Sequence, residues 1–213
     1  SMRIIGDVHG HYSRYRNKVR KMSSSVQLGD FGFVYTSLNG LNPDLHKIIG
    51  GNHDNYDLIY QVPHYLGDFG RTIVDGIDFF FIRGEKSIDQ KGRIEFPLRR
   101  QNHLGHSVLD KKNWWKEEEL GMVECYAALE LFEKEKPDLV MSHGCPLSIV
   151  PFFANENLAN QIQGSSRTAQ ILQAMFEVHQ PSLWIFGHYH QTKSLVAGKT
   201  KFQCLAELDT MEL

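Results

Sequence analysis

Five short polar motifs carry the residues of this chain that could do chemistry. In chain order they are Asp7-Val8-His9, Gly29-Asp30, Gly51-Asn52-His53-Asp54, His143 and Gly187-His188-Tyr189-His190. Together they offer carboxylate, amide and imidazole ligands in about the number that two divalent metal ions sharing one carboxylate would need. Two such ions, held roughly 3.5–4 Å apart, stabilise in-line displacement at phosphorus. The motifs therefore predict a two-metal site for phosphate chemistry.

The spacing within each motif suits the binding of a cation. Asp7 and His9 are two positions apart, and in extended chain this places both side chains on the same side. The last motif repeats the spacing with two histidines. Asp30 has two carboxylate oxygens and can bridge two ions, whereas Asn52 offers a neutral oxygen, which limits the negative charge where a phosphate must bind. Oxygen and nitrogen ligands favour Mn, Fe or Zn.

Each motif follows a short apolar segment that is typical of a β-strand. The sequence predicts strands over residues 3–5, 26–28, 46–49, 138–142, 183–186, 193–196 and 200–205, and a hairpin over 71–83 with its turn at Asp75-Gly76. In α/β folds, ligands gather in the loops at the carboxyl ends of strands. Because all five motifs lie at such ends, the strand pattern supports the proposed site.

Helical periodicity predicts four helices. They are expected over residues 11–22, from near Asp54 (whose carboxylate would cap the helix), over 114–135 and over 168–178. The buried face of the third would comprise Leu120, Val123, Ala127 and Leu131. Alternating strands and helices favour a layered α/β core, and the closing hairpin indicates mixed sheets.

Two segments lack a readable period. Residues 84–113 are polar and glycine-containing and are predicted to form a long loop over the site, and residues 151–166 are predicted to be irregular. A loop as long as the first is usually functional or disordered. We expect one domain spanning residues 1–213, with Ser1 interpreted as a cloning remnant.

Composition narrows the class of protein. The 213 residues are 41% hydrophobic and 23% charged, with a net charge of −2, so nothing in the bulk charge favours nucleic acid or an anionic membrane. Three cysteines without CxxC spacing favour reduced thiols and a cytoplasmic protein. Cys145, two residues after His143, is a minor alternative ligand. No apolar segment approaches the ~18–20 residues that a membrane span needs, and no signal peptide is visible.

The five motifs, in this order, resemble those of the calcineurin-like metallophosphoesterase superfamily: D-x-H, G-D, G-N-H-[DE], H and G-H-x-H. The match runs from residue 7 to residue 190, and a stretch from Arg83 to Asp89 with the later Trp114-Trp115 is similar to bacterial and phage members. The resemblance implies a four-layer α/β/β/α sandwich of two mixed sheets flanked by helices, with the metals in loops at one end of the sheets.

The resemblance also implies a role for each motif residue. It assigns Asp7, His9 and His190 to a first metal, Asn52, His143 and His188 to a second, and Asp30 to both. His53 would be the non-ligand histidine that protonates the leaving oxygen, with Asp54 orienting it. A metal-bridging hydroxide would attack phosphorus in line. Mn²⁺ is the expected ion, with Fe, Zn, Ni and Mg as alternatives.

This sequence departs from the protein Ser/Thr phosphatase branch of the superfamily. That branch reads G-D-x-x-D-R-G in its second motif, whereas here Asp30 is followed by Phe31-Gly32-Phe33. The arginine that grips phosphate in that branch therefore has no match. Arg83, Arg93 and Arg167 are alternatives, because guanidinium binds phosphate through two hydrogen bonds.

Three functions fit these residues. The leading hypothesis is a phosphatase that hydrolyses a phosphate monoester. The second is a phosphodiesterase or nuclease, with nucleic acid only as a substrate. The third is a catalytically dead scaffold, against which the complete ligand set argues. The sequence does not fix the physiological substrate or the oligomeric state.

Overall fold

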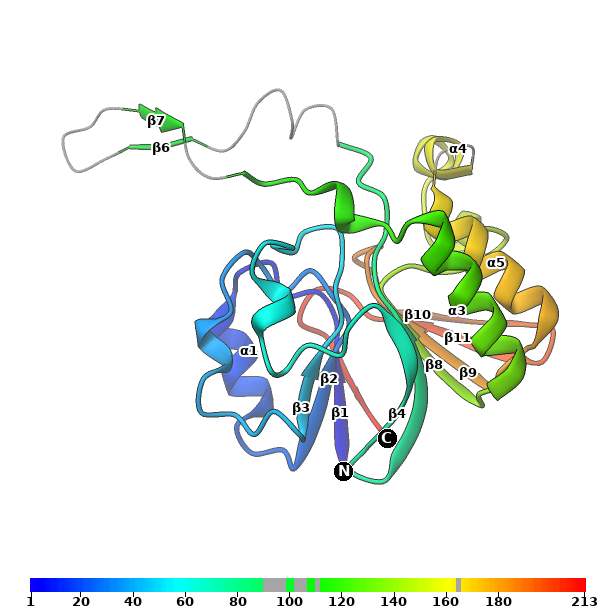
Figure 1. Ribbon diagram of the computed structural model, residues 1–213, viewed down its shortest axis with the longest axis horizontal. Helices are drawn as coiled ribbons and strands as arrows, with labels where there is room; N and C mark the ends of the chain where they lie inside the picture. Colours follow the sequence, from blue (N-terminus) through cyan, green and yellow to red (C-terminus); the bar gives the residue numbers. More distant parts are fainter. Residues whose placement is uncertain (90–98, 102–106, 110–111, 164–165) are drawn as a thin grey trace.

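The computed structural model describes residues 1–89, 99–101, 107–109, 112–163 and 166–213. Two mixed sheets pack face to face and are flanked by helices, which confirms the α/β/β/α sandwich (Figure 1). Helix α1 (Tyr12–Val19) covers one outer face, and helices α3 (Met122–Glu135) and α5 (Arg167–Val178) cover the other. Three buried apolar clusters fill the spaces between these elements. One lies under α1, one lies between the two sheets, and one lies under α3 and α5.

The smaller sheet has four strands in the order β12-β1-β2-β3. Its members are β1 (Met2–Ile5), β2 (Ser24–Gln27), β3 (His46–Ile48) and β12 (Thr210–Glu212). The first three strands run parallel, and β12 pairs antiparallel with β1 through Ile4 opposite Met211. The carboxyl ends of β1, β2 and β3 therefore lie at one edge of the sheet.

The larger sheet has six strands in the order β10-β11-β9-β8-β5-β4. They are β4 (Phe69–Val74), β5 (Ile77–Ile82), β8 (Leu139–Ser142), β9 (Leu183–Phe186), β10 (Lys193–Ala197) and β11 (Thr200–Cys204). The four inner strands are parallel, and an antiparallel hairpin closes each edge. A separate pair of short strands, β6 (Arg99–Gln101) and β7 (Ser107–Leu109), lies within the segment predicted as a loop.

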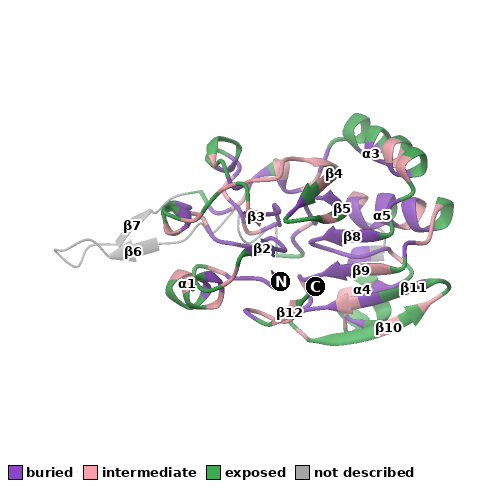
Figure 2. Ribbon diagram, turned by 90° about the horizontal axis from the view of Figure 1, so that it is seen from below, coloured by how far each residue is buried: buried purple, intermediate pink, exposed green. Residues whose placement is uncertain are grey.

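Strand β5 shows why the two sheets stack. Successive side chains of a strand point to opposite faces, and here both faces are apolar. Phe79 and Phe81 pack between the sheets, whereas Phe80 and Ile82 pack under α3 and α5. A strand buried on both sides has this continuous apolar character. In Figure 2 the central strands are accordingly coloured as buried, and exposed residues gather on the outer turns of the helices.

The hairpin predicted over residues 71–83 is confirmed. Val74 pairs with Ile77, which leaves a two-residue turn at Asp75 and Gly76. Both turn residues have positive φ angles, 49° and 79°. This is the combination that the favoured two-residue hairpin turn requires.

The prediction for residues 114–135 is wrong in its start and in its buried face. The chain first forms a 3-10 turn, η3 (Lys116–Glu118), and α3 begins only after Gly121. Its buried residues are Cys125, Ala128 and Phe132, whereas Val123 is 79% exposed. Leu120 precedes the helix, so counting a helical stripe from it gave the wrong phase.

Two further predictions fail locally. No helix starts near Asp54: the chain continues through turns to η2 (Ile59–Gln61), and the Asp54 carboxylate accepts hydrogen bonds from the amides of Asp30 and Gly51 instead of capping a helix. Residues 151–166, predicted as irregular, contain helix α4 (Glu156–Gln163). Short 3-10 turns η1 (Thr36–Leu38) and η4 (Val150–Phe152) complete the described elements. None of the described helices is long and apolar enough to cross a membrane.

Candidate metal centre

The fold gathers the five motifs at one end of the sandwich. They follow β1, β2 and β3 of the smaller sheet and β8 and β9 of the larger sheet. Because these strands are parallel within each sheet, their carboxyl ends meet. All seven predicted ligands lie in this cluster. Six of them, together with His53, form three overlapping groups of Asp and His whose ligand atoms lie within 4.8 Å of one another, and Asn52 lies beside them. We call these seven residues the cage.

One half of the cage is formed by Asp7, His9 and His190. The Nε2 atoms of the two histidines are 3.2 Å apart, and Asp7 Oδ2 lies 3.3 Å from the first and 3.2 Å from the second. Asp7 is buried, whereas the His190 side chain is 55% exposed. Three ligand atoms therefore converge on one point at the surface-facing side of the cage.

The other half is formed by Asn52, His143 and His188. His143 Nε2 lies 3.0 Å from Asn52 Oδ1 and 3.2 Å from His188 Nδ1, and His188 Nδ1 lies 3.1 Å from Asn52 Oδ1. His143 Nδ1 donates to the carbonyl of Leu28 at 2.8 Å. When neutral, His143 therefore carries its proton on Nδ1, and the lone pair of its unprotonated Nε2 points toward the cage.

Asp30 joins the two halves. Its Oδ2 lies 3.5 Å from His9 Nε2, and its Oδ1 lies 3.3 Å from His143 Nε2. The backbone amide of His53 donates to Oδ1 at 2.7 Å and fixes the carboxylate. With one oxygen facing each half, Asp30 has the geometry of a shared ligand.

The cage holds two buried carboxylates, Asp7 and Asp30, whose negative charge suits a bound cation. Burial lowers the pKa of His143, but the carboxylates of Asp30 and Asp7 outweigh burial and raise it to about 10. Burial and the neighbouring His143 charge together lower the pKa of His188 to about 3. A proton on His143 thus supplies positive charge to this acceptor-rich cluster. Its oxygen and nitrogen donors fit divalent Mn, Fe or Zn, and the metal-capable groups of the described residues contain no cysteine.

The backbone at the cage is held in unusual conformations. Four cage residues have positive φ angles: 48° at His9, 56° at Asp30, 70° at His188 and 54° at His190. Such angles are uncommon outside glycine, although Asp and His adopt them more readily than most residues. They turn each side chain back toward the cage from the end of its strand.

Glycine beside the cage is needed for space. Gly29 has a φ of 100°, and a Cβ there would lie 2.7 Å from His143 Nδ1. At Gly187 a Cβ would lie 2.5 Å from Asp7 Oδ1. Side chains at these positions would displace His143 and Asp7.

Asp54 braces two loops of the cage. Its Oδ2 accepts from the amides of Asp30 (2.9 Å) and Gly51 (2.8 Å), and its Oδ1 accepts from the Tyr35 hydroxyl (2.9 Å). Burial, followed by the charge of Asp30, raises the pKa of Asp54 to about 7. These contacts fix the backbone on either side of His53.

His53 lies at the open side of the cage, with its side chain 32% exposed. Its Nδ1 is 3.1 Å from Asp30 Oδ2 and 3.0 Å from Asn52 Nδ2. Nδ1 is therefore directed toward the ligands, and Nε2 is the nitrogen outside these contacts.

Two of the three predicted phosphate-binding arginines, Arg83 and Arg167, bond to residues outside the cage. Arg83 is buried and bonds Asp68 at 2.7 Å, the Tyr60 hydroxyl at 3.0 Å and the carbonyl of Glu117. Arg167 donates to the carbonyl of Leu120. Both arginines line a separate hollow of about 420 Å³. Arg93 lies outside the described residues.

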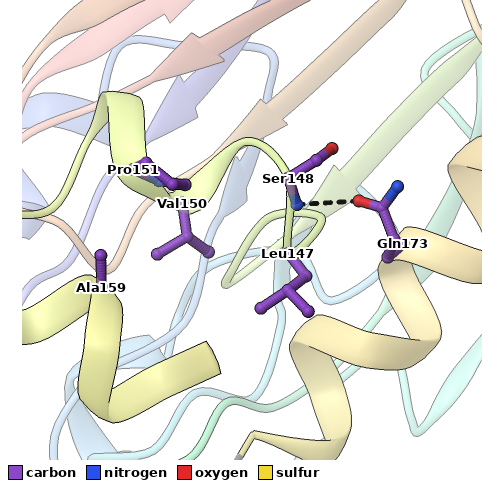
Figure 3. Close-up of a pocket in the computed structure, with 6 residues that line it drawn as sticks. All are labelled: Leu147, Ser148, Val150, Pro151, Ala159 and Gln173. Carbon is purple, nitrogen blue, oxygen red and sulfur yellow. Dashed lines mark hydrogen bonds between the residues drawn. The ribbon is translucent and has the colours of Figure 1, made fainter. Parts of the chain in front are cut away.

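A second hollow, of about 320 Å³, lies between η4, α4 and α5. Figure 3 shows its mainly apolar wall, where the Ser148 amide donates to the side chain of Gln173. Its lining includes no cage residue. Cys145, considered as a ligand, is buried with a free thiol.

One residue that contacts the cage, Ser87, and one behind it, Glu118, were not found from the sequence. Ser87 bonds Asn52, and Glu118 bonds Ser87. Ser87 lies in the stretch from Arg83 to Asp89 that resembles bacterial and phage members, but neither residue lies in one of the five motifs and nothing in the sequence assigned either a role.

Comparison with known proteins assigns the chain to one family. The family model of the calcineurin-like phosphoesterases matches residues 3–192. The chain therefore belongs to the calcineurin-like phosphoesterase family, and it is a metal-dependent hydrolase of phosphoric esters. No curated protein matches the sequence.

Several solved structures are similar to this chain. The phosphopantetheinyl hydrolase of Mycobacterium tuberculosis is 12% identical, with a TM-score of 0.51 over 97% of this chain and 89% of the other. An uncharacterized protein of Streptococcus pneumoniae is 10% identical, with a TM-score of 0.39 over 97% and 71%. GAP50, described as the anchor in the inner membrane complex of Plasmodium, is 12% identical, with a TM-score of 0.45 over 96% and 71%.

Proposed function

We propose that this protein is a phosphatase that uses two divalent metal ions, with Mn²⁺ as the favoured ion, to hydrolyse a phosphate monoester. Asp7, His9 and His190 would hold the first ion, and Asn52, His143 and His188 would hold the second. Asp30 would be shared between them. The observation that carries the proposal is the position of Asp30, whose two oxygens face opposite halves of the cage.

When bound, the two ions supply a nucleophilic water of lowered pKa and neutralise the charge that develops on the phosphoryl group. The protein contributes fixed ligand positions. His143 is oriented by its bond to the Leu28 carbonyl, and Asp30 is oriented by the His53 amide. Little rearrangement is then needed as substrate binds, which is the structural basis of electrostatic preorganisation.

His53 is proposed as the general acid. Its Nδ1 faces Asn52 and Asp30, so a proton on Nε2 is directed away from the ligands, toward the exposed side of the cage. From there it would pass to the leaving oxygen of the ester. A positioned histidine contributes about 10²–10⁴-fold to rate. Asp54 transfers no proton to the substrate in this scheme. It holds the backbone near His53 through the amides of Asp30 and Gly51.

Substitution of the shared ligand tests the proposal. Asp30→Asn retains the shape of the side chain but removes the charge that two ions would share, so we expect Mn²⁺-dependent hydrolysis of p-nitrophenyl phosphate to fall at least 10³-fold, a loss of about 4 kcal/mol in transition-state stabilisation. Circular dichroism should show an unchanged fold. Turnover equal to that of the wild type would exclude the shared role of Asp30.

A comparison of substrates tests the class of ester. The wild type should hydrolyse p-nitrophenyl phosphate faster than bis-p-nitrophenyl phosphate. The opposite preference would assign the cage to a phosphodiesterase or nuclease. No metal-dependent turnover of either ester, of phosphopeptides or of single-stranded nucleic acid would instead indicate a scaffold.

A further inference from the structure

A line of buried hydrogen bonds leads from the cage to the segment after β5. Asn52 Nδ2 donates to Ser87 Oγ at 3.1 Å, and Ser87 Oγ donates to Glu118 Oε2 at 2.6 Å. The three residues are 2–3% exposed. A buried carboxylate is thus connected through one hydroxyl to the amide of a proposed metal ligand.

The direction of each hydrogen bond follows from the chemistry of the groups. An ionised carboxylate only accepts, and a hydroxyl has a single hydrogen to donate. When Ser87 gives that hydrogen to Glu118, its oxygen faces Asn52 as an acceptor and receives the Nδ2 hydrogen. The amide of Asn52 is then oriented with Nδ2 toward Ser87 and Oδ1 toward His143 and His188.

Glu118 itself is held at both oxygens. Oε1 accepts from the Ser87 amide at 3.1 Å and from the Trp114 indole at 2.9 Å, while Oε2 accepts from the Ser87 hydroxyl. The Glu118 carbonyl also accepts from the amide of Glu85 at 3.0 Å. The carboxylate is therefore anchored by two segments of chain and is rigid enough to orient its neighbour.

We propose that Glu118 and Ser87 are positioning residues that select the amide orientation of Asn52 and so set the affinity of the second metal position. This inference rests on the proposed two-metal function. It assigns to an acid and a hydroxyl the part that a carboxylate plays behind a metal-binding histidine, where it fixes orientation and increases the donor strength of the ligand. If the amide of Asn52 were reversed, an NH₂ group would face the cation.

Removal of the hydroxyl is the first test. In Ser87→Ala the Asn52 amide loses its hydroxyl acceptor but keeps the 3.0 Å contact of Nδ2 with His53 Nδ1. We expect the second Mn²⁺ to bind about 10–100-fold more weakly, the usual cost of losing an outer partner of a ligand. Ser87→Thr retains the hydroxyl and should bind two ions. Calorimetric titration of the metal-free protein with Mn²⁺ measures both affinities, and electron paramagnetic resonance distinguishes a coupled Mn²⁺ pair from an isolated ion.

A change at Glu118 tests the direction of the line. Glu118→Gln introduces an NH₂ group that can donate to Ser87, which would turn the Ser87 hydrogen back toward Asn52. The second ion should again be weakened, with the first unchanged. Trp114→Phe is the matched control, because it removes a hydrogen bond to the same carboxylate but leaves the line to Asn52 intact. It should bind both ions as the wild type does.

The outcomes separate this inference from the proposed function. A wild type with a coupled Mn²⁺ pair, and a Ser87→Ala variant that binds the second ion equally well, would overturn the positioning role alone. Equal weakening by Trp114→Phe would also overturn it, because the effect would then reflect general disturbance of Glu118. A wild type that binds no pair would overturn both the inference and the two-metal function.

Discussion

Glu85 is a buried carboxyl group a short distance behind the cage. It is 0% exposed, its Oε1 accepts from the Ser166 hydroxyl and the Lys86 amide, and a Cβ on Gly144, the residue after His143, would strike its other oxygen. Burial raises the pKa of Glu85 to about 7. The folded protein thus binds a proton on Glu85 at pH values where the unfolded chain has released it.

The pH dependence of stability follows from this difference. Below pH 4.5 both states are protonated. As the pH rises toward 7 the unfolded chain loses the Glu85 proton first, so this group lowers the free energy of unfolding by roughly 3 kcal/mol, and above pH 7 the loss is complete. We expect Glu85→Gln to gain about that much stability relative to the wild type between pH 4.5 and pH 8.

Urea unfolding of both proteins at the two pH values measures the change. The difference in free energy of unfolding between the variant and the wild type must widen as the pH rises. A difference that stays constant with pH would show that Glu85 titrates normally. Because Gln keeps an acceptor for Ser166, the comparison isolates the charge.

At the scale of elements, α3 shows that the apolar pattern of a segment does not by itself fix which of its residues tertiary packing buries. The strands could be predicted because their apolar segments are short and bounded by glycine and polar residues. The start and buried face of α3 could not, since Leu120 and Trp115 are buried although they lie outside the helix. Helix α4 lies within residues 151–166, where no helical period was recognised from the sequence. The apolar pattern placed Val123 in the core although it is exposed, and it indicated no buried face for α4.

The corrected face of α3 makes a direct prediction. Phe132 is fully buried, with ring centroids 5.3 Å from Phe80 and 6.3 Å from Trp184. Phe132→Ala should cost about 3–5 kcal/mol of unfolding free energy. Val123→Ala, at the exposed position that the sequence pattern placed in the core, should change it by less than about 0.5 kcal/mol. Thermal or urea unfolding gives both values, and a larger loss at Val123 would restore the original face.

At the scale of the whole molecule, the two sheets act together, because neither sheet alone holds the cage. Asp7, Asp30 and Asn52 follow strands of one sheet, and His143 and His188 follow strands of the other. The motif residues could be predicted since their types and order are distinctive. Ser87 and Glu118 could not, because their role depends on three-dimensional contacts between segments that are separated in sequence.

Because the cage residues come from both sheets, we expect bound metal to stabilise the entire sandwich. An ion that binds only the folded protein adds about 2.7 kcal/mol when its free concentration is 100 times Kd. Removal of metal with a chelator should therefore lower Tm, and added Mn²⁺ should restore it. Asp30→Asn should show a much smaller response, because the shared ligand between the halves is weakened. Equal Tm values with and without Mn²⁺ would contradict a cage that joins the sheets.

The left-handed backbone at His9, Asp30, His188 and His190 has a consequence for how this protein can change over generations. Glycine would relieve the torsional strain at each of these four positions, yet it would delete a proposed metal ligand every time. Selection for a more stable fold and selection for catalytic turnover therefore favour different residues at these four positions. Variants that drift toward a hardier fold can be expected to sacrifice catalysis here first, as inactive descendants of a working ancestor.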